Sequence, residues 1–283
     1  TNITADALSA KDHGYNFEVP FSTEIHPVDP VPLKAMGRFR HEAVAVAPET
    51  GIVYQTEDMS DGLIYRFIPN VPGKLTEGGR LQALAIIGQP SCDTRNWPEL
   101  AGVSLPSKKA LPVEWIDIEG VESPDDSLRF QGFEKGAARF ARGEGMWSGE
   151  GEFFFACTNG GPARQGQIFR YLPSPDEGKA AERRAPAKLE LFVESTHKDL
   201  LRNCDNLTVS PHGHLIVCED ADEPCRLVGV TPAGKLYIIG ENRYTGSELA
   251  GACFSPDGKI LFVNLQAEGL TLAITGPWER AIA

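Results

Sequence analysis

The sequence has no excess of basic residues and no long apolar run. Asp and Glu outnumber Lys and Arg by 39 to 27 in 283 residues, which gives a formal charge of −12. Proteins that bind nucleic acid need clustered Lys and Arg, so we predict no nucleic-acid partner. No apolar run approaches the ~18 residues of a membrane-spanning helix. We therefore expect no membrane span, and the acidic charge is compatible with metal binding.

Motifs of several common enzyme classes are also missing. There is no GxSxG nucleophile elbow and no Walker phosphate-binding loop. The six cysteines form no CxxC pair, which argues against a zinc site of that type. Cys157, Cys218 and Cys253 lie in apolar runs, so we interpret them as core residues. The alternative for Cys218 is a disulfide with Cys225 across one hairpin.

The sequence does contain one pattern that occurs four times. In each copy a short apolar strand leads through a turn into a second apolar strand that ends in acidic or amide side chains. The copies are HEAVAVAPETGIVYQTED from His41, GEGMWSGEGEFFFACTNGG from Gly143, DNLTVSPHGHLIVCED from Asp205 and AGACFSPDGKILFVNLQ from Ala250. The segments LIYRFIP (63–69) and QIFRYLP (167–173) repeat a third strand. Self-similarity at roughly 40–60 residues is typical of radial or stacked β-repeats.

This pattern predicts an all-β fold, a β-propeller with about four to five blades, in a single domain over residues 1–283. Residues from about 89 to 142 are too long for a hairpin loop, so we expect an insertion there. It should carry an isolated strand, VEWIDIE, and a short helix over Glu134–Arg142. GYNFEVP (14–20) predicts an outer strand without partners.

Alignment of the copies places oxygen-bearing side chains in two columns, which a propeller would bring near its axis. The column at the start of the first strand holds His41, Glu42, Arg142, Glu144, Asp205 and Asn206, with only small residues in the fourth copy. The column at the end of the second strand holds Glu57, Asp58, Asn159, Glu219, Asp220, Asn264 and Gln266.

Crowded carboxylates repel unless cations compensate them. One histidine among many oxygens favours a hard ion, Ca²⁺ first, over zinc. The alternative is that these residues form hydrogen bonds in hairpin turns.

Arg142 and His41 are candidates for roles in catalysis. A guanidinium matches phosphate in a bidentate way, so Arg142 beside Glu144 indicates an anionic substrate. An ion pair with the acidic cluster is the alternative for Arg142. His41 is a candidate acid or base, and a structural hydrogen bond is its alternative role.

These residues lie in an ordered set of segments that resembles a known family. GRFRHEAVAV, TEDMSDGLIYRFIP, ARGEGMW, DNLTVSP with CED, and FSPDGKILFVNLQ resemble PhoX-type alkaline phosphatases, in their bacterial PhoX-like branch, over nearly the whole chain. The resemblance implies a β-propeller that hydrolyses phosphate esters at a central site with Ca²⁺ and Fe³⁺. It also implies export to the periplasm or secretion. By motif, Arg142 resembles the substrate-phosphate contact, and the implied metal ligands are Glu42, Glu144, Asp58, Asn159, Asp205 and Glu219.

The resemblance further implies that this chain is the C-terminal two-thirds of such a protein. The family carries a metal-bridging cysteine segment ahead of the region that corresponds to this chain, so we expect part of the iron site to lie outside it. The resemblance implies an enzyme, an alkaline phosphatase-like phosphomonoesterase, and the alternative is that this truncated chain is inactive. We expect a monomer whose partner is a small phosphorylated substrate. Two alternatives stay open: a calcium-dependent lactonase or phosphotriesterase without iron, and a propeller that binds partners without catalysis.

Overall fold

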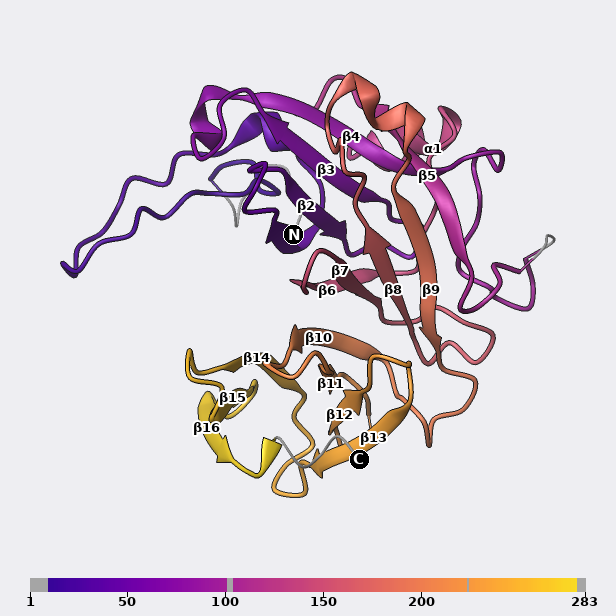
Figure 1. The fold of residues 1–283 in the computed structure, drawn as a ribbon. Coiled ribbons are helices and arrows are strands. Elements are labelled where there is room, and N and C mark those ends of the chain that lie inside the picture. The colour runs from indigo at the N-terminus through magenta and orange to yellow at the C-terminus, as the bar shows by residue number, and fades with distance from the viewer. Residues whose placement is uncertain (1–9, 101–103, 223, 279–283) are drawn as a thin grey trace.

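The structure is a computed structural model that describes residues 10–100, 104–222 and 224–278. This part of the chain is all-β, as predicted, with sixteen strands, one short α-helix and three 3-10 turns (Figure 1). The 3-10 turns are Lys34–Met36, Leu75–Glu77 and Ala180–Arg184. Within the described ranges, no helix has the length and apolar character needed to cross a bilayer.

The strands form four consecutive up-and-down units. The first consists of β1 (His41–Val46), β2 (Val53–Glu57), β3 (Ile64–Pro69) and β4 (Gly79–Ile86). The second consists of β6 (Gly143–Ser148), β7 (Phe153–Cys157), β8 (Gln167–Leu172) and β9 (Lys188–Glu194). The third consists of β10 (Cys204–Val209), β11 (Leu215–Glu219), β12 (Arg226–Val230) and β13 (Leu236–Glu241). The fourth consists of β14 (Leu249–Phe254), β15 (Ile260–Leu265) and β16 (Leu270–Thr275). Strands within a unit pair antiparallel with their sequence neighbours.

The region from 89 to 142 differs from its prediction in two ways. Strand β5 (Ala110–Asp117) is not isolated, because it pairs with both β4 and β9 and joins the first two units into one nine-stranded sheet. The predicted helix over Glu134–Arg142 is wrong, since α1 covers Leu128–Glu134. Gly136 has a φ of +107°, and the backbone N–H of Phe140 then bonds to the Gly62 carbonyl. This buried apolar stretch therefore follows the sheet rather than a helix.

The first strands of successive units lie next to one another. β1 contacts β6, β6 contacts β10, and β10 contacts β14. Figure 1 shows the first two units above and the last two below, with β6 and β10 facing each other between them. The four first strands therefore form the common inner edge of the four units.

The hydrophobic core lies between the faces of successive units. Along β7, Phe153, Phe155 and Cys157 pack towards the first unit, whereas Phe154 and Ala156 pack towards the third. Alternate side chains of a strand point to opposite faces, so a strand between two packed units must be apolar throughout. This explains the continuous run FFFAC. β11 repeats the arrangement, with Leu215 and Val217 on one face and Ile216 and Cys218 on the other.

All six cysteines are free thiols, so the alternative disulfide between Cys218 and Cys225 is not formed. Cys157 and Cys218 are fully buried in the core, and Cys253 is half-buried. The interpretation as core residues agrees with the positions of Cys157 and Cys218, whereas Cys253 is in none of the core clusters.

The N-terminal segment does not form the predicted outer strand. Of GYNFEVP, only Phe17 makes a β-bridge, to Pro32. Residues 17–32 form an extended arm that projects from the body (Figure 1), with Phe21 96% exposed. Four prolines within residues 20–32 remove backbone N–H donors, which explains the absence of a strand ladder here.

The close approach of β6 to β10 depends on Gly145. A Cβ atom at this position would lie 2.7 Å from the Asp205 carbonyl oxygen and 2.8 Å from the Asn206 Cα atom. We expect Gly145→Ala to force the two strands apart and to destabilise the fold by about 1–3 kcal/mol. Thermal unfolding should show Tm lowered by about 2–5 °C.

Gly240→Ala is the matched control, because a Cβ atom at Gly240 would meet no atom within 4 Å. Its Tm should stay within about 2 °C of the unsubstituted protein. Equal Tm values for the two variants would contradict the proposed role of the β6–β10 contact.

Candidate metal centre

Each inner strand carries the same irregularity near its start. The register of the first hairpin shifts between His41 and Val44, Gly143 and Met146, Cys204 and Leu207, and Ala250 and Cys253. Such bulges re-aim side chains and are common beside functional sites. The residues that follow the first paired position are Glu42, Glu144, Asp205 and Gly251, so three of four bulges carry a carboxylate.

A repeated backbone hydrogen bond defines the second column. The donating N–H groups belong to Asp58, Thr158, Asp220 and Gln266, and they bond respectively to the carbonyls of Arg40, Arg142, Asn203 and Glu248. Asp58 and Asp220 are therefore structurally equivalent. The four carbonyl-bearing residues form a third column, which precedes each inner strand.

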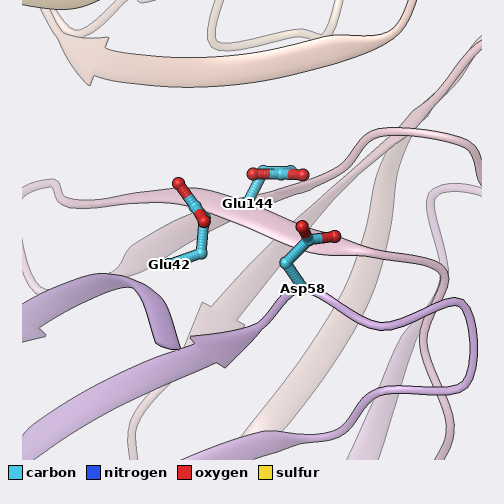
Figure 2. A group of neighbouring side chains, drawn as sticks. All are labelled: Glu42, Asp58 and Glu144. Atoms are coloured by element: carbon cyan, nitrogen blue, oxygen red, sulfur yellow. The ribbon is translucent and has the colours of Figure 1, made fainter. Parts of the chain in front are cut away.

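The first acidic cluster consists of Glu42, Asp58 and Glu144, and we call it triad A. One carboxylate oxygen of each lies within 4.8 Å of the others. Figure 2 shows the three carboxylates converging from β1, from the end of β2 and from β6. Glu144 is buried, Asp58 is half-buried and Glu42 is exposed, so the cluster has an inner and a solvent-facing side.

The second cluster consists of Asp205, Asp220 and Glu248, and we call it triad B. Its ligand oxygens also lie within 4.8 Å of one another, and all three residues are half-buried. Asp205 lies on β10, Asp220 follows β11, and Glu248 precedes β14. Triad B therefore joins the third and fourth units as triad A joins the first and second.

The two triads are electrostatically linked. Burial, followed by repulsion from Asp205 and Asp58, raises the pKa of Glu144 to about 10. Burial and repulsion from Asp220 raise the pKa of Asp205 to about 7, and burial and the hydrogen bond with Asp220 raise the pKa of Glu248 to about 7. Without added positive charge, Glu144 favours its protonated form at neutral pH, and Asp205 and Glu248 are partly protonated there.

Arg142 supplies positive charge to triad A. Its Nε donates to Asp58 Oδ1 at 2.7 Å, and its Nη2 donates to Glu144 Oε1 at 2.7 Å. In the described part of the chain, it is the sole Lys or Arg side chain with an ion pair to either triad. The side chain is 35% exposed, and the hydrogen bonds to Asp58 and Glu144 use Nε and Nη2 and not Nη1.

The backbone of Arg142 is held in an unusual conformation. Its φ of +54° lies in the left-handed region, which residues other than glycine rarely adopt. Its N–H bonds to the Met59 carbonyl, and its carbonyl accepts from the Thr158 N–H. Surrounding bonds thus impose the conformation, which often marks a functional position.

Glu219 lies outside both triads, although it was a predicted metal ligand. It is fully buried, and its carboxylate accepts hydrogen bonds from the guanidinium groups of Arg202 and Arg226. Glu57 occupies the equivalent position and is also fully buried, with Tyr65 and Arg129 beside its carboxylate. Because adjacent side chains alternate along a strand, Glu57 and Glu219 point away from the side that carries Asp58 and Asp220.

Asn159 also lies outside the triads, one residue beyond the position equivalent to Asp58. Its backbone carbonyl accepts a hydrogen bond from the Trp97 indole at 2.8 Å. Its Oδ1 and the Thr158 Oγ1 are buried, and neither has a hydrogen-bond partner within the described residues. In the second unit, Thr158 therefore occupies the position at which the first and third units carry Asp58 and Asp220.

His41 uses both ring nitrogens in structural contacts. Nε2 lies 3.1 Å from the Gly37 carbonyl, so it must donate, and Nδ1 then accepts from Asn16 at 3.3 Å. Burial lowers the pKa of His41 to about 4. The imidazole is therefore neutral at physiological pH, and its position agrees with the structural alternative rather than with proton transfer.

Sequence reasoning missed Glu248 and did not select Asp220 as a ligand. The fourth repeat was read from Ala250, which left only small residues at its start. Glu248 lies two residues earlier, in the column shared with Arg142 and Asn203. Extending each repeat upstream by two residues would have revealed it.

Comparisons with known proteins identify a family. The model described as "Alkaline phosphatase PhoX" matches residues 2–269. No curated protein matches the sequence. Among solved structures, the chain is similar to a virginiamycin B lyase from Staphylococcus aureus, at 12% identity and a TM-score of 0.36 over 86% of this chain and 71% of that chain. It is also similar to a "putative 6-phosphogluconolactonase" from Bacteroides uniformis, at 11% identity and a TM-score of 0.36 over 87% of this chain and 72% of that chain. At such TM-scores, neither likeness carries an argument about fold or activity.

The raised carboxyl pKa values predict a pH-dependent stability in chelator. Because folding raises the pKa of Asp205 and Glu248 to about 7 and that of Glu144 to about 10, their contribution to stability is fully present below the ordinary acid range and is lost progressively as the pH rises to these values. We expect Tm in EDTA to fall by about 5 °C between about pH 6.5 and 9. Millimolar Ca²⁺ should reverse the fall, since a cation replaces the lost protons.

Glu248→Gln should weaken both the pH slope and the Ca²⁺ shift by removing one charge from triad B. Glu241→Gln, at an exposed ion pair with Arg243, is the matched control and should change neither. His41 acts in the opposite sense, because its pKa is lowered from 6.5 to about 4, and its contribution to stability rises with pH up to about 6.5 and is nearly level above that value. A Tm that rises with pH in EDTA would refute the electrostatic interpretation.

Proposed function

The chain belongs to the alkaline phosphatase PhoX family, and on that premise we propose that it hydrolyses phosphate monoesters at triads A and B. One observation carries the proposal: two carboxylate triads lie beside a partly exposed arginine at the inner edge of the strand units. The carboxylates suit cations, and the arginine suits a phosphate. The combination matches what a phosphatase must bind.

The donor set fits hard cations, Ca²⁺ first. The triads offer six carboxylates with neither thiolate nor imidazole among their members, and Ca²⁺ takes six to eight oxygen ligands. The linked pKa increases point the same way, because this many crowded carboxylates need positive charge to stay ionised. Fe³⁺ is a hard ion as well, and we retain it as the second cation that the family resemblance implies.

The residues divide the work between holding cations and holding phosphate. We assign Glu42, Asp58 and Glu144 to one cation site and Asp205, Asp220 and Glu248 to another. When bound, such cations would neutralise the ester phosphate and act as Lewis acids. Gly145 permits the close backbone approach that brings Glu144 of triad A near Asp205 of triad B. Both sites can then act on one small substrate.

Arg142 would orient the phosphate. Its bonds to Asp58 and Glu144 fix the plane of the guanidinium in advance, which limits the entropy lost on binding. The exposed part of the group can donate to a phosphate oxygen and stabilise charge in the transition state. We assign no proton transfer to His41, since both of its nitrogens already make hydrogen bonds.

The repeated architecture suggests the wider setting of the site. We propose that the four units are consecutive blades of a β-propeller in a single domain, with the inner strands around its axis. Stacked apolar faces between successive units support this proposal. Export to the periplasm or secretion, and a monomeric state, are proposals carried over from the family resemblance.

The proposal predicts chelator-sensitive hydrolysis of 4-nitrophenyl phosphate. Glu144→Gln should lower kcat/KM by about 100-fold, because it removes a buried ligand from triad A. Arg142→Lys should lower it by a similar factor, since an ammonium group cannot make the same bidentate contacts. Arg243→Lys is the control and should leave turnover unchanged, because Arg243 is exposed, pairs with Glu241 and contacts neither triad.

Elemental analysis of the purified protein should accompany the kinetics. We expect calcium, and loss of calcium in Glu144→Gln. Full activity in that variant would refute the assignment of Glu144. Hydrolysis of a lactone with no phosphatase activity, and calcium without iron, would instead favour the lactonase alternative.

A further inference from the structure

A large cavity opens beside the solvent-facing member of triad A. It has a volume of about 920 Å³, and Glu42 and His41 line it on the side of the site. Residues 10–17 line the opposite side, with Pro30, Pro32 and Lys34 completing the wall. A phosphate held at triad A would therefore have its ester group beside this cavity.

The wall formed by the N-terminal segment is firmly anchored. The Asn16 carbonyl accepts from the Leu33 N–H at 2.9 Å, and the Gly14 carbonyl accepts from the Phe39 N–H at 3.2 Å. Asn16 Nδ2 donates to the buried Gln55 Oε1 at 2.7 Å. Tyr15 lies between two anchored residues, so its position relative to β1 is fixed.

The cavity offers flat apolar surfaces together with charged groups at its edge. The rings of Tyr15 and Phe17 and two prolines line it, and Phe17 is 49% exposed. The Lys34 ammonium lies 6.0 Å from the Tyr15 ring centre and pairs with Glu122 at 2.6 Å. Aromatic rings bind best against such surfaces, by stacking or edge contacts. The volume suits a ligand of drug or nucleoside size.

We propose that this cavity receives the leaving group of the substrate, and that it selects phosphate monoesters of flat aromatic alcohols. Tyr15 is the specificity-determining residue, and Phe17 supports it. The inference rests on the proposed phosphatase function, because it places the phosphate at triad A. It adds a substrate class, aromatic rather than small aliphatic esters, which triads A and B do not distinguish.

A binding experiment tests the proposal without turnover. Calorimetry in Ca²⁺ would compare phenylphosphonate with methylphosphonate, which share the phosphate-like group and resist hydrolysis. We expect phenylphosphonate to bind about 10-fold more tightly, and Tyr15→Ala to remove that advantage. Methylphosphonate affinity should stay unchanged. Tyr15→Phe should retain the preference, since it keeps the ring.

Tyr244→Ala is the matched control, because Tyr244 is 77% exposed and lies outside the cavity lining. It should leave both affinities unchanged. If Tyr15→Ala lowers the thermal stability of the fold, Phe17→Ala gives a second test at a half-exposed position. Equal affinity for the two phosphonates in the unsubstituted protein would overturn the inference.

Turnover separates this inference from the proposed function. The kcat/KM ratio of 4-nitrophenyl phosphate to glycerol 3-phosphate should fall about 10-fold in Tyr15→Ala relative to the unsubstituted protein. Hydrolysis of both esters with an unchanged ratio would overturn the inference and leave the phosphatase function standing. Absence of hydrolysis of either ester would refute the phosphatase function, and the phosphonate affinities would then decide the cavity by themselves.

Discussion

Mutual repulsion among six carboxylates is the constraint on which the site depends. Triads A and B gather these groups at the inner edge of four strand units, and Arg142 bonds to two of them. Burial and repulsion raise the pKa of Glu144, which shows that ionisation of the whole cluster is unfavourable without added positive charge. A protein that maintains such a cluster gains from binding cations, which connects its stability directly to its chemistry.

The surrounding scaffold holds the carboxylates in place despite this repulsion. Next to Asp58 and Asp220 in the sequence, the buried acids Glu57 and Glu219 are held by other contacts: Glu219 pairs with two arginines, and Glu57 accepts hydrogen bonds from the Leu63 N–H and the Tyr65 hydroxyl. The apolar faces of β7 and β11 pack against the neighbouring units, and this packing holds the units together. A rigid inner edge of this kind allows donors from different strands to share a ligand.

The repeat pattern predicted the site better than it predicted local structure. Glu42, Asp58, Glu144 and Asp205 were all selected from aligned strand ends, and the structure brings each of them into a triad. The repeat pattern selected Glu219, whereas the structure places the adjacent Asp220 in triad B, because neighbouring side chains of a strand point in opposite directions. The helix predicted over Glu134–Arg142 failed because the apolar residues of 137–141 are buried against the sheet, which outweighs helix propensity.

The sequence by itself determined the all-β class, the fourfold repeat and most of the acidic residues of the site, because alternation and turn residues are local signals. Tertiary structure alone decided which acids meet, since Glu248 joins Asp205 and Asp220 only after two units have packed. It also decided which partners Glu219 and His41 contact, because Arg226 and Asn16 reach them only in the folded chain. The close approach of β6 to β10 at Gly145 brings Glu144 of triad A near Asp205 of triad B, and no local sequence pattern encodes this approach.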